Sequence, residues 1–210
     1  MKYPINTDTW ERGSTFRHFI RYSNPYFGIC TEIDFTNAYL RAKELKVSFF
    51  LYYFYLSLSA ANSIPAFRTR LEGKSPVLYD KVNGSPTVLR HDGGLGFAML
   101  EYAETFNDFL KLAKPELERV RSQTVMDASK DRPDTIYYSI IPWIRFTSVS
   151  HPLDLPNTEG VPILTFGKTF MESGKVMMPL GIHAHHALMD GMHVHLFLEA
   201  FRKRLNECTV

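Results

Sequence analysis

The first regular pattern along the chain is an alternation of hydrophobic and polar positions. Apolar or β-branched side chains occupy every second position from Ile29 to Phe35, a period that predicts a half-buried β-strand over residues 26–35. Asp34 and the polar residues just after it can cap a helix. The pattern predicts one helix over residues 38–61, ended by residues 63–65.

That helix contains the most hydrophobic stretch of the chain, residues 47–60. Residues 47–67 carry no charge, but the apolar block is shorter than the roughly 20 residues of a membrane span. It also includes three tyrosines and three serines. We therefore expect a helix buried in a folded core and no membrane segment.

The remaining pattern predicts short strands and two further helices. Pro115 marks a bend or restart in the first of these helices. Turns are expected at Asn83-Gly84, at residues 92–94, and at residues 172–174, where a hairpin joins two strands. The expected strands are residues 67–71, 77–79, 87–90, 135–141, 144–148, 162–170 and 175–185, and the expected helices are residues 105–122 and 191–207. The last helix is expected to place near one face Met192, Leu196, Phe197, Ala200 and Leu205.

These elements indicate a mixed α/β domain. We expect an α+β two-layer sandwich in which helices pack against a large mixed β-sheet. The regular βαβ alternation and glycine fingerprint of a dinucleotide fold are absent from the sequence. No internal repeat or long linker divides the chain, so residues 1–210 are expected to form a single domain.

Composition narrows the function classes. Hydrophobic residues make up 45% and charged residues 22% of the chain, and the net charge is +2, which is typical of a folded protein and gives no basic run for nucleic acid. Cys30 and Cys208 are too few to staple a domain of this size, which fits a reducing compartment. The first thirteen residues lack the apolar core of a signal peptide, so a cytoplasmic location is expected.

Histidine is concentrated in one window. Five of the eight histidines fall within thirteen residues, at His183, His185, His186, His193 and His195. Three or four imidazoles can bind zinc, but the helical H-E-x-x-H spacing and nearby cysteines are missing, so no metal is expected. The alternative for most of them is packing at a strand end or at a subunit contact.

His186 differs from its neighbours because of the residues after it. The segment from His185 to Gly191 joins a predicted strand to a predicted helix, so it should form a tight turn, which Gly191 permits. A neutral imidazole at a strand end can face a pocket and act as a general base near neutral pH. Asp190 is expected to anchor the turn.

Several motifs carry a family resemblance. HHALMDGMHV, from His185 to Val194, resembles the active-site signature of the classical trimeric chloramphenicol acetyltransferases. Further matches follow in the family's order and lie at Trp10 to Arg12 with Phe16, at residues 62–70 (NSIPAFRTR), at Pro142-Trp143 with Phe146 to Ser148, at Phe166 to Lys168, and at Met178 to Leu180. Together they span nearly the whole chain.

The resemblance implies a direct acetyl transfer. His186 would be the general base that deprotonates a hydroxyl of chloramphenicol as this oxygen attacks the thioester of acetyl-CoA, the co-substrate. Ser148 would donate a hydrogen bond to the resulting oxyanion, and Asp190 would pair with Arg12 to fix the turn. The reaction would need no metal and no acyl-enzyme, and would confer antibiotic resistance.

The resemblance also implies a homotrimer with active sites between subunits. Phe19, Phe27 and Phe97 align with aromatic positions of the family's acceptor pocket. The sequence departs from the family pattern at Met189 and Met192, and also in the segment His91 to Gly96 (HDGGLG), which borders the acceptor site. These departures leave room for a related enzyme that acts on a different hydroxyl acceptor.

Two other readings stay open at this stage. The signature is shared with dihydrolipoyl transacylase cores and with peptide-synthetase condensation domains, although the latter are about twice as long and the former carry additional domains. A catalytically idle trimer that only binds a ligand is the third possibility, and the joint presence of His186, Asp190, Ser148 and Arg12 argues against it.

Overall fold

A seven-stranded mixed sheet forms the centre of the protein. The computed structural model describes residues 1–127, 132–154 and 159–207. Six of the strands lie in the order β2-β10-β8-β7-β5-β6, and β9 pairs with the first residues of β10. Strand β7 runs parallel to β5 and to β8, and the other pairs are antiparallel. Their bounds are β2 Tyr26–Asp34, β5 Asn83–Leu89, β6 Leu95–Phe97, β7 Thr135–Ile140, β8 Ile163–Phe166, β9 Phe170–Glu172 and β10 Lys175–His185.

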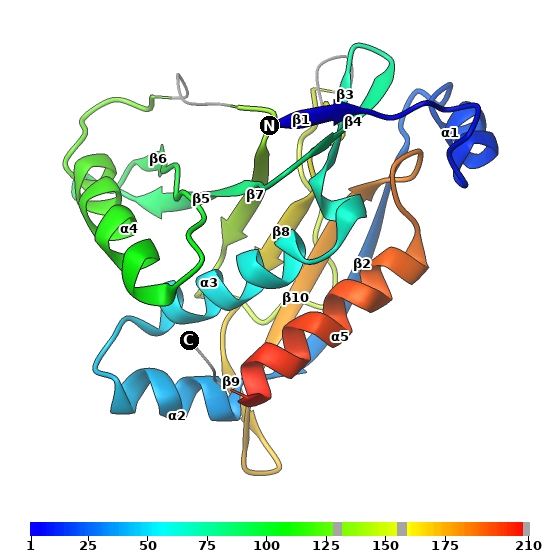
Figure 1. The fold of residues 1–210 in the computed structure, drawn as a ribbon. Coiled ribbons are helices and arrows are strands. Elements are labelled where there is room, and N and C mark those ends of the chain that lie inside the picture. Colours follow the sequence, from blue (N-terminus) through cyan, green and yellow to red (C-terminus); the bar gives the residue numbers. More distant parts are fainter. Residues whose placement is uncertain (128–131, 155–158, 208–210) are drawn as a thin grey trace.

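Helices cover one face of this sheet (Figure 1). They are α2 Thr36–Glu44, α3 Phe49–Asn62, α4 Phe106–Arg121 and α5 Gly191–Glu207, and the short α1 Gly13–Phe19 lies beyond the start of β2. Aromatic side chains join the two layers: the ring of Tyr53 on α3 lies 5.0 Å from that of Phe166 on β8, and Phe201 on α5 contacts the same ring. The expected α/β architecture of a large mixed sheet with packed helices is confirmed.

The uncharged stretch forms the buried helix α3. Ten of its residues are buried, including Tyr52, Phe54 and Leu58. Phe54 lies so close to β5 that a side chain on Gly84 would meet its ring at 2.4 Å, so a glycine is required there. No helix in the described part of the chain is long and apolar enough to cross a membrane.

The single helix predicted over residues 38–61 is wrong, because the chain forms two helices there. Helix α2 ends at Glu44, and Lys46 adopts a left-handed φ of 55°. Val47 N–H donates to the carbonyl of Ala42 at 3.0 Å, which is the bond that closes a Schellman motif. Ser48 then caps α3 by accepting from the N–H of Leu51 at 3.4 Å.

Four smaller expectations are also corrected. Residues 144–148 do not form a strand, and Asn83-Gly84 begins β5 instead of making a turn. The buried side of α5 is formed by Val194, Phe197, Leu198, Phe201 and Leu205, whereas Met192 is 64% exposed and Leu196 is also exposed. Helix α4 runs through Pro115 without a break.

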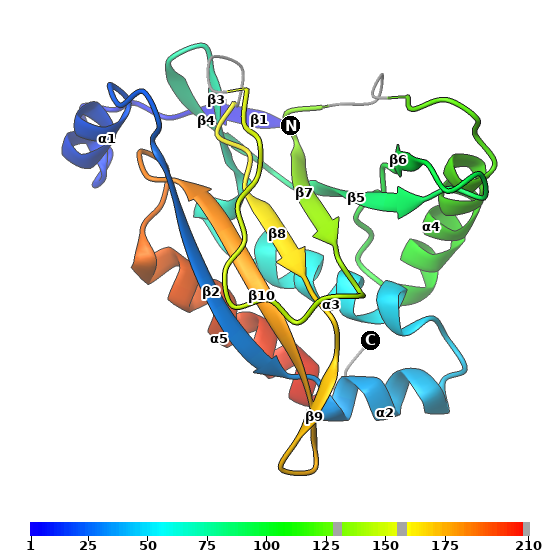
Figure 2. The same ribbon diagram turned by 180° about the vertical axis from the view of Figure 1, so that it is seen from behind.

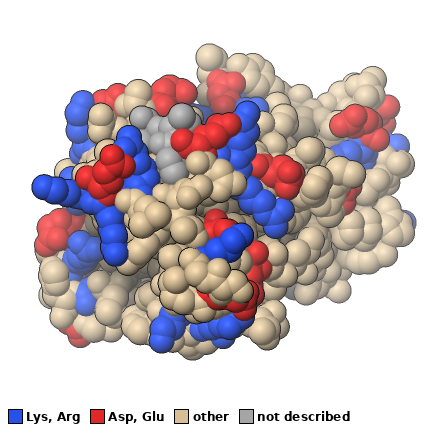
Figure 3. Space-filling model, turned by 90° about the horizontal axis from the view of Figure 1, so that it is seen from below, with Lys and Arg blue, Asp and Glu red and all other residues tan. Residues whose placement is uncertain are grey.

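At the start of α2, Asp34 accepts from the N–H of Thr36 at 2.9 Å, although Phe35 holds the N-cap position. Thr105 caps α4 by accepting from Asp108 N–H at 3.2 Å. Ser173 and Gly174, with φ values of 49° and 77°, make the expected hairpin turn between β9 and β10. Charge is distributed as the composition suggested: Figure 3 shows basic and acidic side chains interspersed on one face of the molecule.

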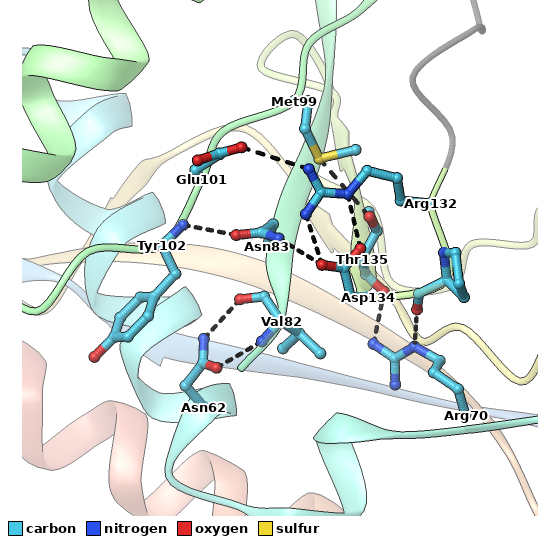
Figure 4. Close-up of polar contacts among 11 residues, drawn as sticks. Asn62, Arg70, Val82, Asn83, Met99, Glu101, Tyr102, Arg132, Asp134 and Thr135 are labelled. Atoms are coloured by element: carbon cyan, nitrogen blue, oxygen red, sulfur yellow. Dashed lines mark hydrogen bonds and ion pairs between the residues drawn. The ribbon is translucent and has the colours of Figure 1, made fainter. Parts of the chain in front are cut away.

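A polar network ties the small sheet to the large one (Figure 4). The small sheet consists of β1 Lys2–Pro4, β4 Ser75–Tyr79 and β3 Thr69–Glu72, which follows the short helix Pro65–Arg68. On β3, the fully buried Arg70 donates hydrogen bonds to the carbonyls of Pro133 and Thr135 at 2.8 and 2.6 Å, and to two carbonyls of its own segment. Asn62 pairs with both backbone groups of Val82.

Replacing Arg70 with lysine is expected to lower the free energy of unfolding by about 3 kcal/mol, because an ammonium cannot reach four carbonyls and leaves several of them buried without a donor. Urea unfolding measures the change. The exposed pair of Arg202 and Glu199 supplies the control: Arg202→Lys should change stability by less than about 0.5 kcal/mol. Equal effects of the two substitutions would contradict this role.

Candidate active site

The turn after β10 places His186 at the end of the sheet. His186 N–H donates to the carbonyl of Pro25 at 2.8 Å, which attaches the turn to the segment before β2. Leu188 and Met189 both donate to the carbonyl of His185, at 2.9 and 3.1 Å. Residues 187–189 are fully buried, so this turn has little freedom to move.

An ion pair between Arg12 and Asp190 locks the same turn. Arg12, which is 8% exposed, binds the Asp190 carboxylate and also donates from Nη2 to the carbonyl of His186 at 3.2 Å. The other carboxylate oxygen of Asp190 accepts from Met192 N–H at 3.0 Å and from His193 at 2.9 Å. Asp190 therefore caps α5 and joins it to the N-terminal segment, as the expected pairing of these two residues requires.

The pKa of Asp190 reflects these contacts. Partial burial alone would raise it, but the hydrogen bonds and positive charge of Arg12, together with those of His193, lower the pKa of Asp190 to about 2. The carboxylate is thus ionised throughout the neutral range. A charge-assisted contact of this kind is stronger than a neutral hydrogen bond.

Two phenylalanines hold the imidazole of His186. The ring of Phe19 on α1 stacks on it with centroids 3.9 Å apart and an angle of 5°, and Phe27 on β2 lies at 4.8 Å. Nδ1 of His186 is buried and has no hydrogen-bond partner among the described residues. Nε2 is not buried, so it is the ring nitrogen that a substrate can reach. The structure thus brings together His186, Asp190, Arg12, Phe19 and Phe27.

The other histidines of the window have separate roles. His185 is 2% exposed and accepts from Ala187 N–H, and burial together with His186 lowers its pKa to about 4, so it stays neutral. His193 binds Asp190, and His195 lies exposed on α5. Within the ranges that the structure describes, no three histidine, cysteine or acidic side chains are grouped to hold a metal ion.

Among the described residues, neither Ser148 nor Phe97 makes a hydrogen bond or ring contact with His186. Figure 2 shows the segment after β7 crossing the sheet face opposite the helices. Ser148 is in this segment and is exposed. Phe97, on β6, lines a cavity of about 420 Å³ together with Thr87, Tyr137, Ser139, His151 and Ile163. Neither His186 nor any charged side chain is among the described residues that line this cavity.

The departures from the family pattern fall in different surroundings. Met189 is fully buried in the core, whereas the exposed Met192 lies on the first turn of α5. Leu95, within the segment from His91 to Gly96, lines the cavity directly. Arg90 lies beneath this segment, where a side chain on Gly94 would meet its guanidinium at 2.1 Å. Through Leu95, the segment that departs from the family pattern therefore forms part of the cavity wall.

Sequence reasoning missed two residues, His151 and Thr165, on the sheet face opposite the helices, which is called the open sheet face below. Nε2 of His151 lies 2.7 Å from the hydroxyl of Thr165, which is fully buried on β8. Their hydrogen bond joins residues fourteen apart in the sequence, which no local periodicity indicates. The position of His151 three residues after Ser148 was the one available signal.

Comparison with known proteins places the whole chain in one group. A family model described as chloramphenicol acetyltransferase matches residues 1–202. A chloramphenicol acetyltransferase of Staphylococcus intermedius is 28% identical over 201 residues, covering 94% of this chain and 93% of the relative. One from Staphylococcus aureus is 29% identical over 203 residues, with the same coverage of 94% and 93%.

Solved structures agree with the sequence relatives. A chloramphenicol acetyltransferase structure superimposes with a TM-score of 0.90 at 29% identity, and the match covers 98% of this chain and all of the other. The cubic core of a pyruvate dehydrogenase multienzyme complex superimposes with a TM-score of 0.68 at 19% identity over 93% of this chain and 87% of the other, a likeness of fold alone.

Replacement of Asp190 by asparagine is expected to destabilise the protein at neutral pH and to do so less at low pH. The pKa of Asp190 is lower in the folded chain than the ordinary 3.8, so its ionised form contributes stability above about pH 4 and loses that contribution as the pH falls towards 2. Urea unfolding of both proteins at pH 6 and pH 3 measures the difference.

The exposed carboxylate of Asp8, 3.4 Å from Arg17, provides the matched control. Asp8→Asn should change stability by less than about 0.5 kcal/mol at either pH. A destabilisation by Asp190→Asn that is the same at pH 6 and pH 3 would show that its charge is not what holds the turn.

Proposed function

This chain belongs to the chloramphenicol acetyltransferase family, and from that membership we propose that it transfers the acetyl group of acetyl-CoA to a hydroxyl of chloramphenicol and so confers resistance to this antibiotic. The observation that carries the proposal is the imidazole of His186, stacked on Phe19, fixed by Arg12 and Asp190, and accessible at Nε2. A base held in this way meets the geometric need of proton abstraction.

The chemistry is a single transfer between two substrates. Nε2 of His186 takes the proton of the acceptor hydroxyl as its oxygen attacks the thioester carbonyl carbon. The resulting tetrahedral intermediate collapses by breaking the bond from carbon to sulfur, and the thiolate of CoA leaves and takes up a proton. The acceptor oxygen then carries the acetyl group, and no bond to the enzyme forms.

Ser148 supplies the hydroxyl proposed to stabilise the oxyanion of that intermediate. Its exposure on the open sheet face leaves it accessible to a bound substrate. The loss of one such donor commonly costs on the order of 3 kcal/mol of transition-state stabilisation. The role of Ser148, like those of Arg12 and Asp190, rests on the family resemblance and on the positions just described.

A homotrimer completes the proposed site. Within one chain, the cavity that includes Phe97 does not include His186, so one subunit alone does not bring base and acceptor together. A neighbouring subunit whose His186 faces this cavity would do so, with Phe19 and Phe27 beside the base. A ring of identical subunits closes through such head-to-tail contacts.

Other parts of the proposal follow from the same comparisons. The family model spans residues 1–202, which supports one domain over residues 1–210, and a cytoplasmic location fits the use of acetyl-CoA. The altered cavity wall at Leu95 favours a second candidate function, acetyl transfer to a different uncharged alcohol. Neither candidate requires a metal.

Replacing His186 with alanine is expected to reduce the release of free CoA thiol from acetyl-CoA and chloramphenicol by about 10²- to 10⁴-fold, because the general base is lost. A colorimetric thiol assay measures this. His195→Ala, on the exposed side of α5, is the control and should retain wild-type activity. Unchanged thiol release by His186→Ala would overturn the mechanism, and release with only another alcohol would overturn the acceptor.

A mixing experiment tests the shared site. Ser139→Trp should fill the cavity and abolish activity while leaving His186 intact. His186→Ala should also abolish activity, but it should leave the cavity intact. When the two variants assemble together, roughly a quarter of randomly formed interfaces join an intact base to an intact cavity, so activity should return. No recovery from mixed assemblies that have been verified by mass would contradict a site shared between subunits.

A further inference from the structure

His151 places an imidazole in the wall of the cavity that also contains Phe97. The cavity is lined mostly by aromatic, aliphatic and hydroxyl side chains, and none of the described lining residues carries a formal charge. Apart from the hydroxyl groups of serine, threonine and tyrosine, the imidazole of His151 is the group of this wall that can form hydrogen bonds through its side chain. A ligand that fits this lining has an uncharged, largely apolar body.

Two neighbours fix the orientation of the His151 ring. Nε2 of His151 shares a hydrogen bond of 2.7 Å with the Thr165 hydroxyl, and the ring of His183 on β10 meets it edge to face at 5.2 Å. Both Thr165 and His183 belong to the sheet, so the ring is held against a rigid surface. Nδ1 has no partner among the described residues and is not buried.

The imidazole of His151 is neutral at physiological pH. Burial lowers its pKa below the ordinary 6.5, and the neighbouring His183 lowers it further. A neutral imidazole with one nitrogen occupied by Thr165 has one nitrogen left, which donates or accepts according to the tautomer. It can therefore match an uncharged polar group without repelling it.

From this arrangement we propose that His151 is a specificity-determining residue that binds the acceptor alcohol through Nδ1, by a hydrogen bond to a hydroxyl or amide group other than the one that is acetylated. The proposal rests on the proposed function, because it takes the cavity as the acceptor site. Thr165 acts as a positioning residue, since its hydroxyl binds Nε2 and leaves Nδ1 as the nitrogen available to a ligand in the cavity.

A purely structural role of His151 makes a different prediction. His151 lies three residues after Ser148, and between them Val149 packs on β10, where it would touch a side chain added to Gly181 at 2.6 Å. If His151 only held this segment in place, its loss would displace Ser148 and lower kcat. Loss of a contact to the acceptor instead raises KM and weakens binding of the acceptor alone.

The experiment compares His151→Leu, His151→Gln and Thr165→Val with the wild type in the thiol assay, on chloramphenicol and a panel of other alcohols. With the alcohol that the wild type uses best, His151→Leu should raise KM about 5- to 10-fold, as expected for one hydrogen bond to an uncharged group, and leave kcat within about twofold. The KM of His151→Gln should lie between those of the wild type and His151→Leu. Thr165→Val should raise KM less than His151→Leu does.

His195→Leu, the same substitution on the opposite side of the molecule, should leave both constants unchanged. Because Thr165→Val retains His151 and closely preserves shape, it keeps the test decisive should His151→Leu fail to fold. An unchanged KM in both variants, or a fall in kcat without a rise in KM, would overturn the role of His151. A wild type that uses another alcohol but not chloramphenicol would overturn only the acceptor, and the comparison is then made on that alcohol.

Discussion

The contact between Arg12 and Asp190 is the constraint on which the geometry of the site depends. It joins residues 178 positions apart, so the turn that carries His186 is held by the N-terminal segment as well as by its own backbone hydrogen bonds. The same carboxylate caps α5, where a negative charge is favoured by the helix dipole. The same guanidinium binds the carbonyl of His186. Turn, helix and base are therefore oriented by one pair of charges.

The two faces of the sheet have different tasks: one packs against the helices, and the other carries the cavity. On one face, the aromatic residues of α3 and α5 pack closely, as shown by the contacts of Phe166 with Tyr53 and Phe201. The other face carries a cavity and a crossing segment. Strand β10 serves both, because its alternate side chains enter the helical core or face the cavity side, and its end delivers His186.

Much of the fold could be predicted from the sequence, since period, caps and turns are local signals. The alternation before Phe35, the helix that starts near Thr105 and the hairpin at Gly174 were of this kind. The break between α2 and α3 at Lys46 could not be predicted, because lysine at a left-handed position lacks the glycine or asparagine that usually signals a helix end. His186 and Asp190 were found through their motif. The stacking of the His186 ring on Phe19 and the contact of His151 with Thr165 depend on tertiary packing, which no local pattern predicts.

The cavity wall and the support of His186 are built from different parts of the chain. Strands β5, β6 and β7 and the segment around His151 form the first, whereas α1, the start of β2 and the turn into α5 form the second. Under the proposed function, substitutions that refit the wall to another alcohol would therefore leave the base and its supports untouched. Acceptor choice and proton abstraction could then change independently of one another along this chain.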